Sequence, residues 1–468
     1  MVKAQPREVL AVNRRTALVA DTLRRLVRRG ARSRISNILR KTRPEDVAEV
    51  LPTLTPEHQT SVFEILLDDL PAASGEVLIE VEPSLRLALL DSLPSDRIAG
   101  LLTLQPVDDQ VFLLEALPEE RRDEVLALVN DPERDKVETH LTYGDDTAGR
   151  IMDSQFYALS EDKTIGEAIA AIQESRDMEN IFYLFVVDNG GHLTGVTSLR
   201  QLLLSAPQRP LAQIMTQSVI KVHIETDQEE VAELATRYNL LAVPVVDDDN
   251  RLVGIVTVDD IIDVVQEEAN EDFFKMVGTS EDELVYQDRS FKVAGIRLPW
   301  LLVNLIGLMG AAYLLSSFET SLGQPLYLAL YAFVPAIMGM GGNIGSQTST
   351  ITVRGFATGR VSLTQGHVSK FLWQQTKVGV ILGISCALVV GFTASFWNAS
   401  PFHGIVVGVA MCATILLASL TGVLIPVLFE RIGIDPAVAA GPLVTTSNDI
   451  TGILIYFGIA AVLVQYVP

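Results

Sequence analysis

A single carboxylate interrupts a long apolar segment near the C-terminus. The stretch GPLVTTSNDITGILIYFGIAAVLVQYV, residues 441–467, is hydrophobic enough to lie in lipid, yet Asp449 falls about a third of the way along it. A charged side chain at the centre of a bilayer helix costs about 2.5 kcal/mol or more, and such residues mark ion or substrate pathways. The four residues before it, 445–448, are also polar. We therefore interpret Asp449 as pore-lining rather than as an interfacial residue that reaches water.

A second polar stretch, PAIMGMGGNIGSQTSTITVRGFATG, covers residues 335–359. Gly341 and Gly345 form a GxxxG pattern, which in membrane helices allows close helix packing. The polar residues beside these glycines make a polar lining a stronger interpretation than packing alone: Asn343, Ser346, Gln347 and Thr348.

An acidic cluster precedes the apolar half of the chain. Ten acidic residues lie between Asp247 and Asp272, and only Arg251 opposes them. Asp260 and Asp263 are three residues apart, which places them on one helical face where their charges repel. A solvated acidic surface would explain this pattern. A hard divalent cation such as Mg²⁺, which takes oxygen ligands, would relieve the repulsion. The position of the cluster just before the first span favours a cation sensor.

The charge balance divides the chain near residue 290. Residues 291–468 contain seven basic and four acidic residues, a net charge of +3, whereas residues 1–290 contain 29 basic and 54 acidic residues, a net charge of −25. So acidic a region argues against nucleic acid as a partner, because phosphates recruit Lys and Arg. The two cysteines, Cys386 and Cys412, lie in apolar stretches and suggest neither a disulfide nor a thiolate metal site.

Five apolar stretches are long enough to cross a bilayer as helices. They cover residues 297–318, 327–350, 371–396, 404–429 and 442–466. Lys and Arg are absent from the loops 319–326 and 397–403 but present before the first span and in the other two loops. Since positive residues mark the cytoplasmic side, we expect a multi-pass protein of the cytoplasmic membrane with a cytoplasmic N-terminus and an outer C-terminus.

The acidic half contains an internal repeat. RIMDSQFYAL followed by YLFVVDNGGHLTGVTSLRQLL corresponds to QIMTQSVIKV followed by AVPVVDDDNRLVGIVTVDDII. Two copies of about 60 residues that alternate strands and helices are typical of a tandem of CBS-type modules. Such modules commonly hold adenine nucleotides beside a Ser/Thr-x-x-acid spacing. The second copy has Thr257 and Asp260, whereas the first has Ser198 and Gln201.

Residues 35–140 have a helical pattern. Several segments, among them RPEDVAEVL, LTPEHQTSVFEILL and LPEERRDEVLALV, open with Pro and an early acid, as helix starts do. We expect short successive helices in a small superhelical domain. The first 30 residues are basic and amphipathic without a long apolar core, so we expect a surface helix rather than a signal peptide.

Over nearly its whole length the chain resembles the MgtE family of magnesium channels. The most specific segments are GGNIGSQ and RGFATG within residues 335–359, and Asp435-Pro436 followed by GPLVTTSNDITGILIYF. The resemblance implies a multidomain fold with an α-helical superhelical N domain, an α+β tandem CBS pair and a five-helix transmembrane domain. The expected boundaries are 1–140 for the N domain, 141–207 and 208–270 for the CBS modules, 271–296 for a connecting (plug) helix and 297–468 for the pore domain.

The same resemblance implies a function: a homodimeric channel for Mg²⁺ uptake that closes when Mg²⁺ binds acidic cytosolic sites. Asp449 matches the selectivity carboxylate, with Thr445 and Asn343 on the same pathway. The implied sensor residues are Asp227, Glu229, Asp260, Asp263, Glu268, Glu271 and Asp272, with Asp435 at the cytosolic mouth. ATP would bind the CBS modules near Tyr183 and Arg200. In the N domain, positions that carry acids in the family hold Arg97 and Gly100 here, beside Asp96.

Two other classes of protein fit less well. An intramembrane aspartyl protease needs two aspartates that share a proton, but Asp435 lies in a cytoplasmic loop and no Gly-x-Gly-Asp precedes Asp449. A nucleotide-sensing receptor would use the CBS pair and leave the polar segments of the second and fifth spans without a role. We therefore predict a transporter and not an enzyme.

Overall fold

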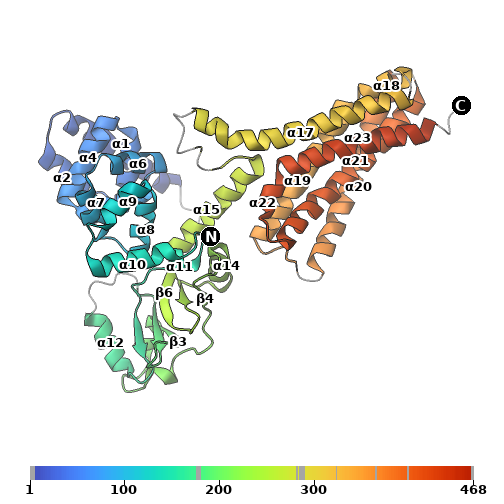
Figure 1. Cartoon of the computed structure of the whole chain (residues 1–468). Helices are drawn as coiled ribbons and strands as arrows, with labels where there is room; N and C mark the ends of the chain where they lie inside the picture. The colour runs from blue at the N-terminus through green and yellow to red at the C-terminus, as the bar shows by residue number, and fades with distance from the viewer. Residues whose placement is uncertain are drawn as a thin grey trace. The chain divides into compact units, whose positions relative to one another are not determined.

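The computed structural model describes residues 6–174, 181–280, 283, 290–322, 324–363, 366–397 and 400–464. The chain divides into two compact units, Met1–Val265 and Gln266–Pro468. The first is the acidic part of the sequence and the second contains the apolar part. Figure 1 shows helices at the start of the first unit, two small sheets after them, and long helices in the second unit.

Short helices build the first part of the acidic unit. They are α1 (Pro6–Val27), α2 (Arg32–Leu39), α3 (Pro44–Val50), η1 (Leu51–Thr53), α4 (Pro56–Asp69), α5 (Pro71–Glu80), α6 (Pro83–Asp91), α7 (Ser95–Leu102), α8 (Val107–Glu115), α9 (Glu119–Leu126) and α10 (Asp131–Thr142). The predicted helix starts are confirmed for α3 and α4, where Pro is the first helical residue. In α9 the proline is instead the N-cap, Pro118. One shared core, which includes Leu23, Phe63 and Leu114, holds these helices together.

Two similar three-stranded sheets follow. Their elements are α11 (Ala148–Ile151), β1 (Ala158–Ser160), α12 (Ile165–Glu174), β2 (Tyr183–Val187), β3 (Leu193–Ser198), α13 (Leu199–Leu204), η2 (Leu211–Gln213), β4 (Val222–His223), α14 (Gln228–Tyr238), β5 (Ala242–Val246), β6 (Leu252–Thr257) and α15 (Val258–Val277). In each sheet the first strand pairs parallel with the second, which pairs antiparallel with the third. The register shifts at Val186/Val187 and again at Val245/Val246, so the predicted repeat is confirmed down to its irregularity.

The two repeats are packed into each other. A Cβ on Gly195 of the first copy would lie 2.5 Å from the Sδ atom of Met215, which opens the second copy. Conversely, a Cβ on Gly254 of the second copy would lie 2.5 Å from the Sδ atom of Met152 in the first. The methionine of each Ile-Met segment therefore packs against the central glycine of the other copy.

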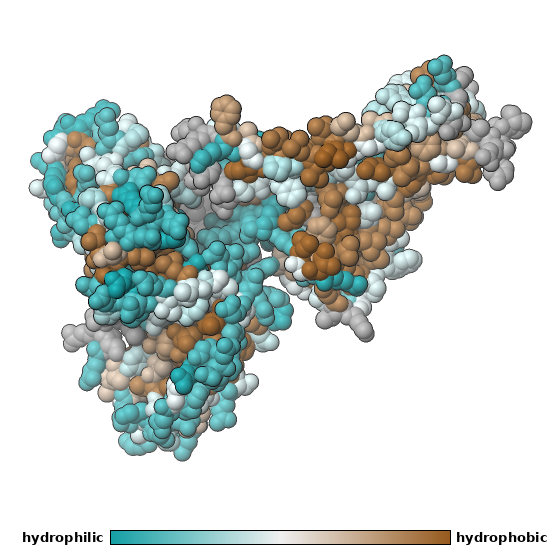
Figure 2. All heavy atoms as spheres, viewed as in Figure 1, coloured by the Kyte–Doolittle hydropathy of each residue, from teal (hydrophilic) through white to brown (hydrophobic). Residues whose placement is uncertain are grey.

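Among the described residues of the second unit, five helical stretches are long and apolar enough to cross a membrane: Ser290–Thr320, Leu326–Ala357, His367–Trp397, Pro401–Arg431 and Pro442–Leu463. The helices are α17 (Ser290–Leu322), α18 (Gln324–Tyr331), α19 (Val334–Ala357), α20 (His367–Trp397), α21 (Pro401–Arg431), α22 (Pro436–Ala440) and α23 (Pro442–Val464). Helix α21 packs on α19, α20 and α23, and α23 also packs on α17. Apolar side chains cover much of the visible face of these helices (Figure 2).

The second predicted span is two helices rather than one. Helix α18 ends at Tyr331 and α19 begins at Val334, followed by Pro335, which cannot donate a helical hydrogen bond. The fully buried Tyr456 of α23 donates its hydroxyl to the carbonyl oxygen of Leu330 at 2.9 Å, which satisfies a backbone group at the break.

The predicted connecting helix over 271–296 is described at its two ends but not through its middle. Helix α15 ends at Val277, Gly278 has a φ of 77°, and α17 begins at Ser290. Most residues between 280 and 290 are outside the description, so the connecting helix stays a prediction.

Candidate functional site

Asp449 lies in the second turn of α23, in the interior of the second unit, Gln266–Pro468, which we call the membrane unit because of its apolar helices. Its side chain is 8% exposed. Among the described residues, none makes a hydrogen bond or ion pair with its carboxylate. Burying a charged group without a partner is costly, so a carboxylate in this position is available to a cation or to water.

The polar residues of α19 divide between two faces. Asn343 and Gln347, one helical turn apart, are exposed in the single chain. Ser346 is half-buried and its hydroxyl lies 3.3 Å from that of Thr445 on α23. Thr348 is buried at the contact with α21. The interpretation of this whole segment as a polar lining is therefore wrong for Thr348, whose face packs against protein.

The GxxxG glycines also have a packing role. A Cβ on Gly341 would lie 3.1 Å from a methyl carbon of Thr414 on α21. A Cβ on Gly345 would lie 1.9 Å from the side-chain nitrogen of Asn448 on α23. The packing interpretation is therefore confirmed for the face with Gly341 and Gly345, and a polar lining stays a prediction for the exposed face with Asn343 and Gln347.

The end of α15 is joined to α22 by an ion pair. Lys275 Nζ lies 2.7 Å from Asp435 Oδ2 and also contacts Glu271 one turn before it. Asp435 Oδ1 accepts a hydrogen bond from the backbone N–H of Ala437 at 2.7 Å and so caps α22. Met276 packs on a small cluster that includes Ala437. One ammonium thus neutralises two of the predicted sensor carboxylates.

Burial and neighbouring charges shift the pKa values of Lys275, a member of this ion pair, and of Asp272 near it. Burial, together with the nearby Asp435, raises the pKa of Asp272 to about 6. Burial alone would lower the pKa of Lys275, but its hydrogen bonds to Asp435 and Glu271 raise that pKa above its ordinary value. Asp272 therefore carries a proton for part of the time near neutral pH, whereas Lys275 stays charged.

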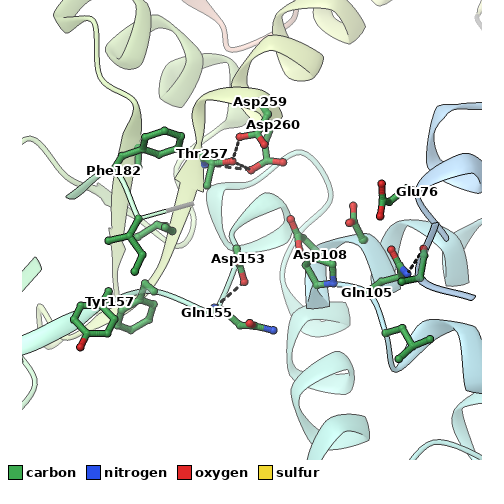
Figure 3. A pocket seen from close by; sticks show the side chains of 18 of the residues that line it. Glu76, Gln105, Asp108, Asp153, Gln155, Tyr157, Phe182, Thr257, Asp259 and Asp260 are labelled. Carbon is green, nitrogen blue, oxygen red and sulfur yellow. Dashed lines mark hydrogen bonds between the residues drawn. The ribbon is translucent and has the colours of Figure 1, made fainter. Parts of the chain in front are cut away.

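A cavity of about 730 Å³ lies within the first unit (Figure 3). One part of its wall comes from the helices at α5 and α8, including Glu76, Asp108 and Asp109, and another from the CBS pair, including Asp153 and Asp260. Its lining contains eight carboxylates and, among the described residues, neither Lys nor Arg. Asp260 is fixed from its own element: the backbone N–H of Thr257 donates to its Oδ2 at 3.1 Å. The cavity can attract cations and repels anions.

Several carboxyl groups of this cavity have pKa values above their ordinary range. Burial and the neighbouring Asp260 raise the pKa of Asp109 to about 7, and burial raises that of Asp260 to about 6 although Thr257 opposes the shift. Burial, followed by repulsion from Asp109, raises the pKa of Asp108 well above its ordinary value. One oxygen of Asp108 is buried and has no hydrogen-bond partner among the described residues.

The structure distributes the predicted sensor residues over three places. Asp227 is the N-cap of α14 and accepts a hydrogen bond from the backbone N–H of Glu229 at 2.8 Å. Asp260 lines the cavity. The remaining residues lie on α15 or beside it: Asp263, Glu268, Glu271, Asp272 and Asp435. In the part of the chain that is described, no three Asp, Glu, His or Cys side chains form a group that could hold a metal ion.

The two residues expected near a nucleotide are separated. Tyr183 lines the cavity, and its hydroxyl oxygen accepts a hydrogen bond from the backbone N–H of Leu241 at 3.4 Å. Arg200 is exposed in the first turn of α13 and is not part of the cavity lining. In the first repeat, the backbone N–H of Gln201 donates to the Ser198 hydroxyl, and the Gln201 side chain donates to the carbonyl oxygen of Ile214. That position therefore supplies a structural contact where the second repeat has Asp260.

The N-terminal helices supply acids that the sequence analysis missed. Arg97, one of the two substituted positions, forms an ion pair with Asp68, and the Gly100 position lies on the same short helix α7. The acids of this region that face the cavity are instead Asp108 and Asp109, in the first turn of α8 after Pro106. A proline followed by early acids was available as a signal, but it indicates a helix start and not the direction of the carboxylates.

Family models cover most of the chain. Residues 42–146 match the MgtE intracellular N domain, residues 148–206 and 211–267 match the CBS domain, and residues 334–459 match the MgtE model described as a divalent cation transporter. The last of these covers α19 to α22 and most of α23, with Asn343 and Asp449.

Curated relatives agree with these matches. The chain is 33% identical over 387 residues to the magnesium transporter MgtE of Bacillus subtilis, which covers 82% of this chain and 84% of the relative. It is 37% identical to the protein of that name from Thermus thermophilus, over 71% of this chain and 74% of the relative.

A solved structure of a cytosolic domain is similar to about half of this chain. The cytosolic domain of the Mg²⁺ channel MgtE in complex with ATP is 34% identical with a TM-score of 0.50, and the match covers 52% of this chain and 99% of that one. The helical N domain, the CBS pair and the apolar helices with their buried acid occur in the order that these matches require, which also confirms the prediction of a transporter rather than an enzyme. The chain therefore belongs to the MgtE family of divalent cation transporters.

Proposed function

We propose that this chain forms a homodimeric, Mg²⁺-selective channel for magnesium uptake. The observation that carries the proposal is Asp449, a carboxylate in the interior of the apolar unit with no partner among the described residues. One chain supplies one such group. A two-fold axis through this site would supply the second, since each interface element of a symmetric dimer occurs twice.

Two facing carboxylates suit a hydrated divalent ion. Mg²⁺ loses its water slowly and keeps several waters when it binds to proteins through one or two carboxylates. The two Asp449 side chains would accept hydrogen bonds from that water shell, and their joint charge of −2 favours a divalent over a monovalent ion. The exposed polar face of α19 with Asn343 would continue the pathway, and Thr445 would border it.

The acidic cavity and the end of α15 would sense cytosolic Mg²⁺ and control the opening of the channel. Carboxylates such as Asp109 and Asp260 repel one another when ionised, so Mg²⁺ favours the arrangement that gathers them. A ligand shifts a conformational equilibrium only by its difference in affinity for the two states. High cytosolic Mg²⁺ would therefore stabilise the gathered, closed arrangement. Such a site does not require three acids of one chain, because a hydrated Mg²⁺ can be held by one or two carboxylates.

The orientation follows from the basic loops. Arg354 and Arg431 end α19 and α21, while the loops at the other ends of these helices lack Lys and Arg. By the positive-inside rule the N-terminal unit is cytoplasmic and the C-terminus lies outside. The acidic cavity is then on the side where it can sense cytosolic Mg²⁺.

ATP is a second candidate ligand, at the CBS pair. The observation in its favour is the aromatic wall with Tyr183 beside Thr257 in the cavity, together with the ATP complex of the related cytosolic domain. Because the cavity is lined by carboxylates, the triphosphate would have to enter with Mg²⁺ neutralising its charge. Equilibrium binding of ATP at fixed Mg²⁺ tests this, and Tyr183→Ala should weaken binding; unchanged affinity would remove the cavity as the site.

The experiment for the pore is Mg²⁺ flux into liposomes. Asp449→Ala should reduce uptake to the level of empty liposomes while the protein elutes at its normal size. Glu319→Ala, an exposed acid near the end of α17, is the matched control and should transport normally. Selective Mg²⁺ uptake by Asp449→Ala would contradict the proposal.

A further inference from the structure

The polar residues before Asp449 connect α23 to its neighbours. The Thr446 hydroxyl donates to Asn304 Oδ1 on α17 at 2.8 Å, and the Thr445 hydroxyl lies 3.3 Å from that of Ser346 on α19. Thr446 is buried and Thr445 is half-buried. The polarity of this run, which in the sequence supported a lined passage, is largely used inside the helix bundle.

Asn448 makes the most extensive of these connections. Its side chain is 1% exposed. Its Oδ1 accepts a hydrogen bond from the Thr421 hydroxyl of α21 at 2.7 Å, and its Nδ2 donates to the carbonyl oxygen of Gly341 of α19 at 3.4 Å. One amide therefore links three helices.

The amide occupies a slot that a glycine provides. A Cβ on Gly345 would lie 1.9 Å from Asn448 Nδ2 and 3.1 Å from its side-chain carbon Cγ. Any larger residue at position 345 would have to displace the amide. The rotation of α23 about its axis is thus fixed by shape as well as by hydrogen bonds.

The Asp449 side chain makes no such connection to the residues that the structure describes. Because successive residues of a helix point about 100° apart, a helix whose rotation is fixed at Asn448 also has a fixed direction at Asp449. Hydrogen bonds between membrane helices stabilise their packing modestly, and a group that both donates and accepts also fixes orientation.

We propose that Asn448 is the positioning residue for the Asp449 carboxylate. By holding α23 against α19 and α21, it keeps Asp449 directed at the ion pathway and sets the spacing between the two carboxylates of the dimer. The inference rests on the proposed pore function of Asp449 and adds a determinant of selectivity that does not contact the ion.

The first test is the permeability ratio of Mg²⁺ to Na⁺ in reconstituted channels. Asn448→Ala should lower this ratio by about fivefold, the effect of losing about one interhelical hydrogen bond. Thr421 can keep a partner in the variant, since its hydroxyl also contacts the carbonyl oxygen of Ala418 at 3.1 Å. Thr451→Val is the matched control, because among the described residues the Thr451 hydroxyl bonds to carbonyl oxygens of its own helix, and it should keep the wild-type ratio.

A double substitution tests whether the amide and the glycine slot act through one contact. Gly345→Ala alone should lower the permeability ratio, because its methyl group displaces the amide. Gly345→Ala combined with Asn448→Ala should be closer to wild type than Gly345→Ala alone, since the methyl group then fills the vacated slot. If the two residues acted through separate contacts, the effects of the two changes would instead add.

The outcomes distinguish the inference from the function on which it rests. A wild-type ratio in Asn448→Ala, while Asp449→Ala abolishes uptake, would overturn the positioning role and leave the pore intact. Selective uptake by Asp449→Ala would overturn the proposed pore itself. If Asn448→Ala does not fold, Thr421→Val removes only the donor to its oxygen; a folded Thr421→Val with an unchanged ratio would then overturn the inference.

Discussion

Buried carboxylates occur in both units of the molecule, but in opposite arrangements. In the membrane unit, Asp449 is buried by itself and its neighbours are committed to helix contacts. In the first unit, Asp108, Asp109 and Asp260 share a cavity with five further acids. A lone acid needs a second copy of the chain to complete a divalent site, whereas the cluster can respond to a cation within one chain. We therefore assign ion selection to the lone Asp449 and sensing of cytosolic Mg²⁺ to the acidic cavity.

Neutralising the predicted sensor residues, with Asp449 left intact, should have the largest effect on channel closure. The combination of Asp260→Asn, Asp263→Asn and Glu268→Gln should leave the pore open at high cytosolic Mg²⁺, because the repulsion that Mg²⁺ relieves is gone. Patch-clamp currents at rising Mg²⁺ on the cytoplasmic face measure this, and the Mg²⁺/Na⁺ selectivity should not change.

The matched control neutralises three acids in the β5–β6 turn, Asp247, Asp248 and Asp249, to Asn. Asp247 accepts backbone hydrogen bonds there that Asn can also accept. This variant should close normally. If the sensor variant closes at the same Mg²⁺ concentration as the control, the division between selection and sensing is wrong.

A pH change should affect the sensor next most strongly. The pKa of Asp109 is raised to about 7 and those of Asp260 and Asp272 to about 6, so below these values the groups hold protons that Mg²⁺ must displace. The Mg²⁺ concentration that half-closes the channel should therefore be about tenfold higher at pH 6 than at pH 8. Asp109→Asn should flatten this dependence, whereas an unchanged slope would exclude Asp109 from sensing.

The smallest expected effect concerns the ammonium that already neutralises part of the sensor. Lys275→Met should increase the current without cytosolic Mg²⁺, because Glu271 and Asp435 lose their common counter-ion and repel each other. For a partly exposed pair the change should be about twofold to fivefold. Lys370→Met, an exposed lysine of α20, is the control. A current equal to that of the control would mean that the pair has no part in gating.

The sequence predicted best what depends on local pattern. Hydropathy located the five spans, and the repeated Gly and Val-Val-Asp spacing located both sheets, since these signals come from contiguous residues. The acid in α23 stood out for the same reason, because polarity is rare in an apolar run. The break before Pro335 divided the second span, although a proline in that position was visible as a signal.

What the sequence could not predict depends on distant residues. Asp108 and Asp109 were not singled out from the sequence, because only the packing of α8 brings them to the cavity of Asp260, which is about 150 positions away. Asn448 looked like part of a polar lining, and only the glycine slot of α19 makes it a helix contact. In both cases the residue type was visible but its direction was not.

The central claim is that two Asp449 side chains face one another across a dimer axis. The most direct measurement is cross-linking of Asp449→Cys in a background where Cys386 and Cys412 are replaced by Ala, with a short bifunctional thiol reagent in membranes. We predict a covalent dimer at position 449 that high Mg²⁺ no longer affects, because the variant lacks the carboxylate. Efficient labelling of that cysteine by a lipid-soluble reagent, with no covalent dimer, would contradict the account.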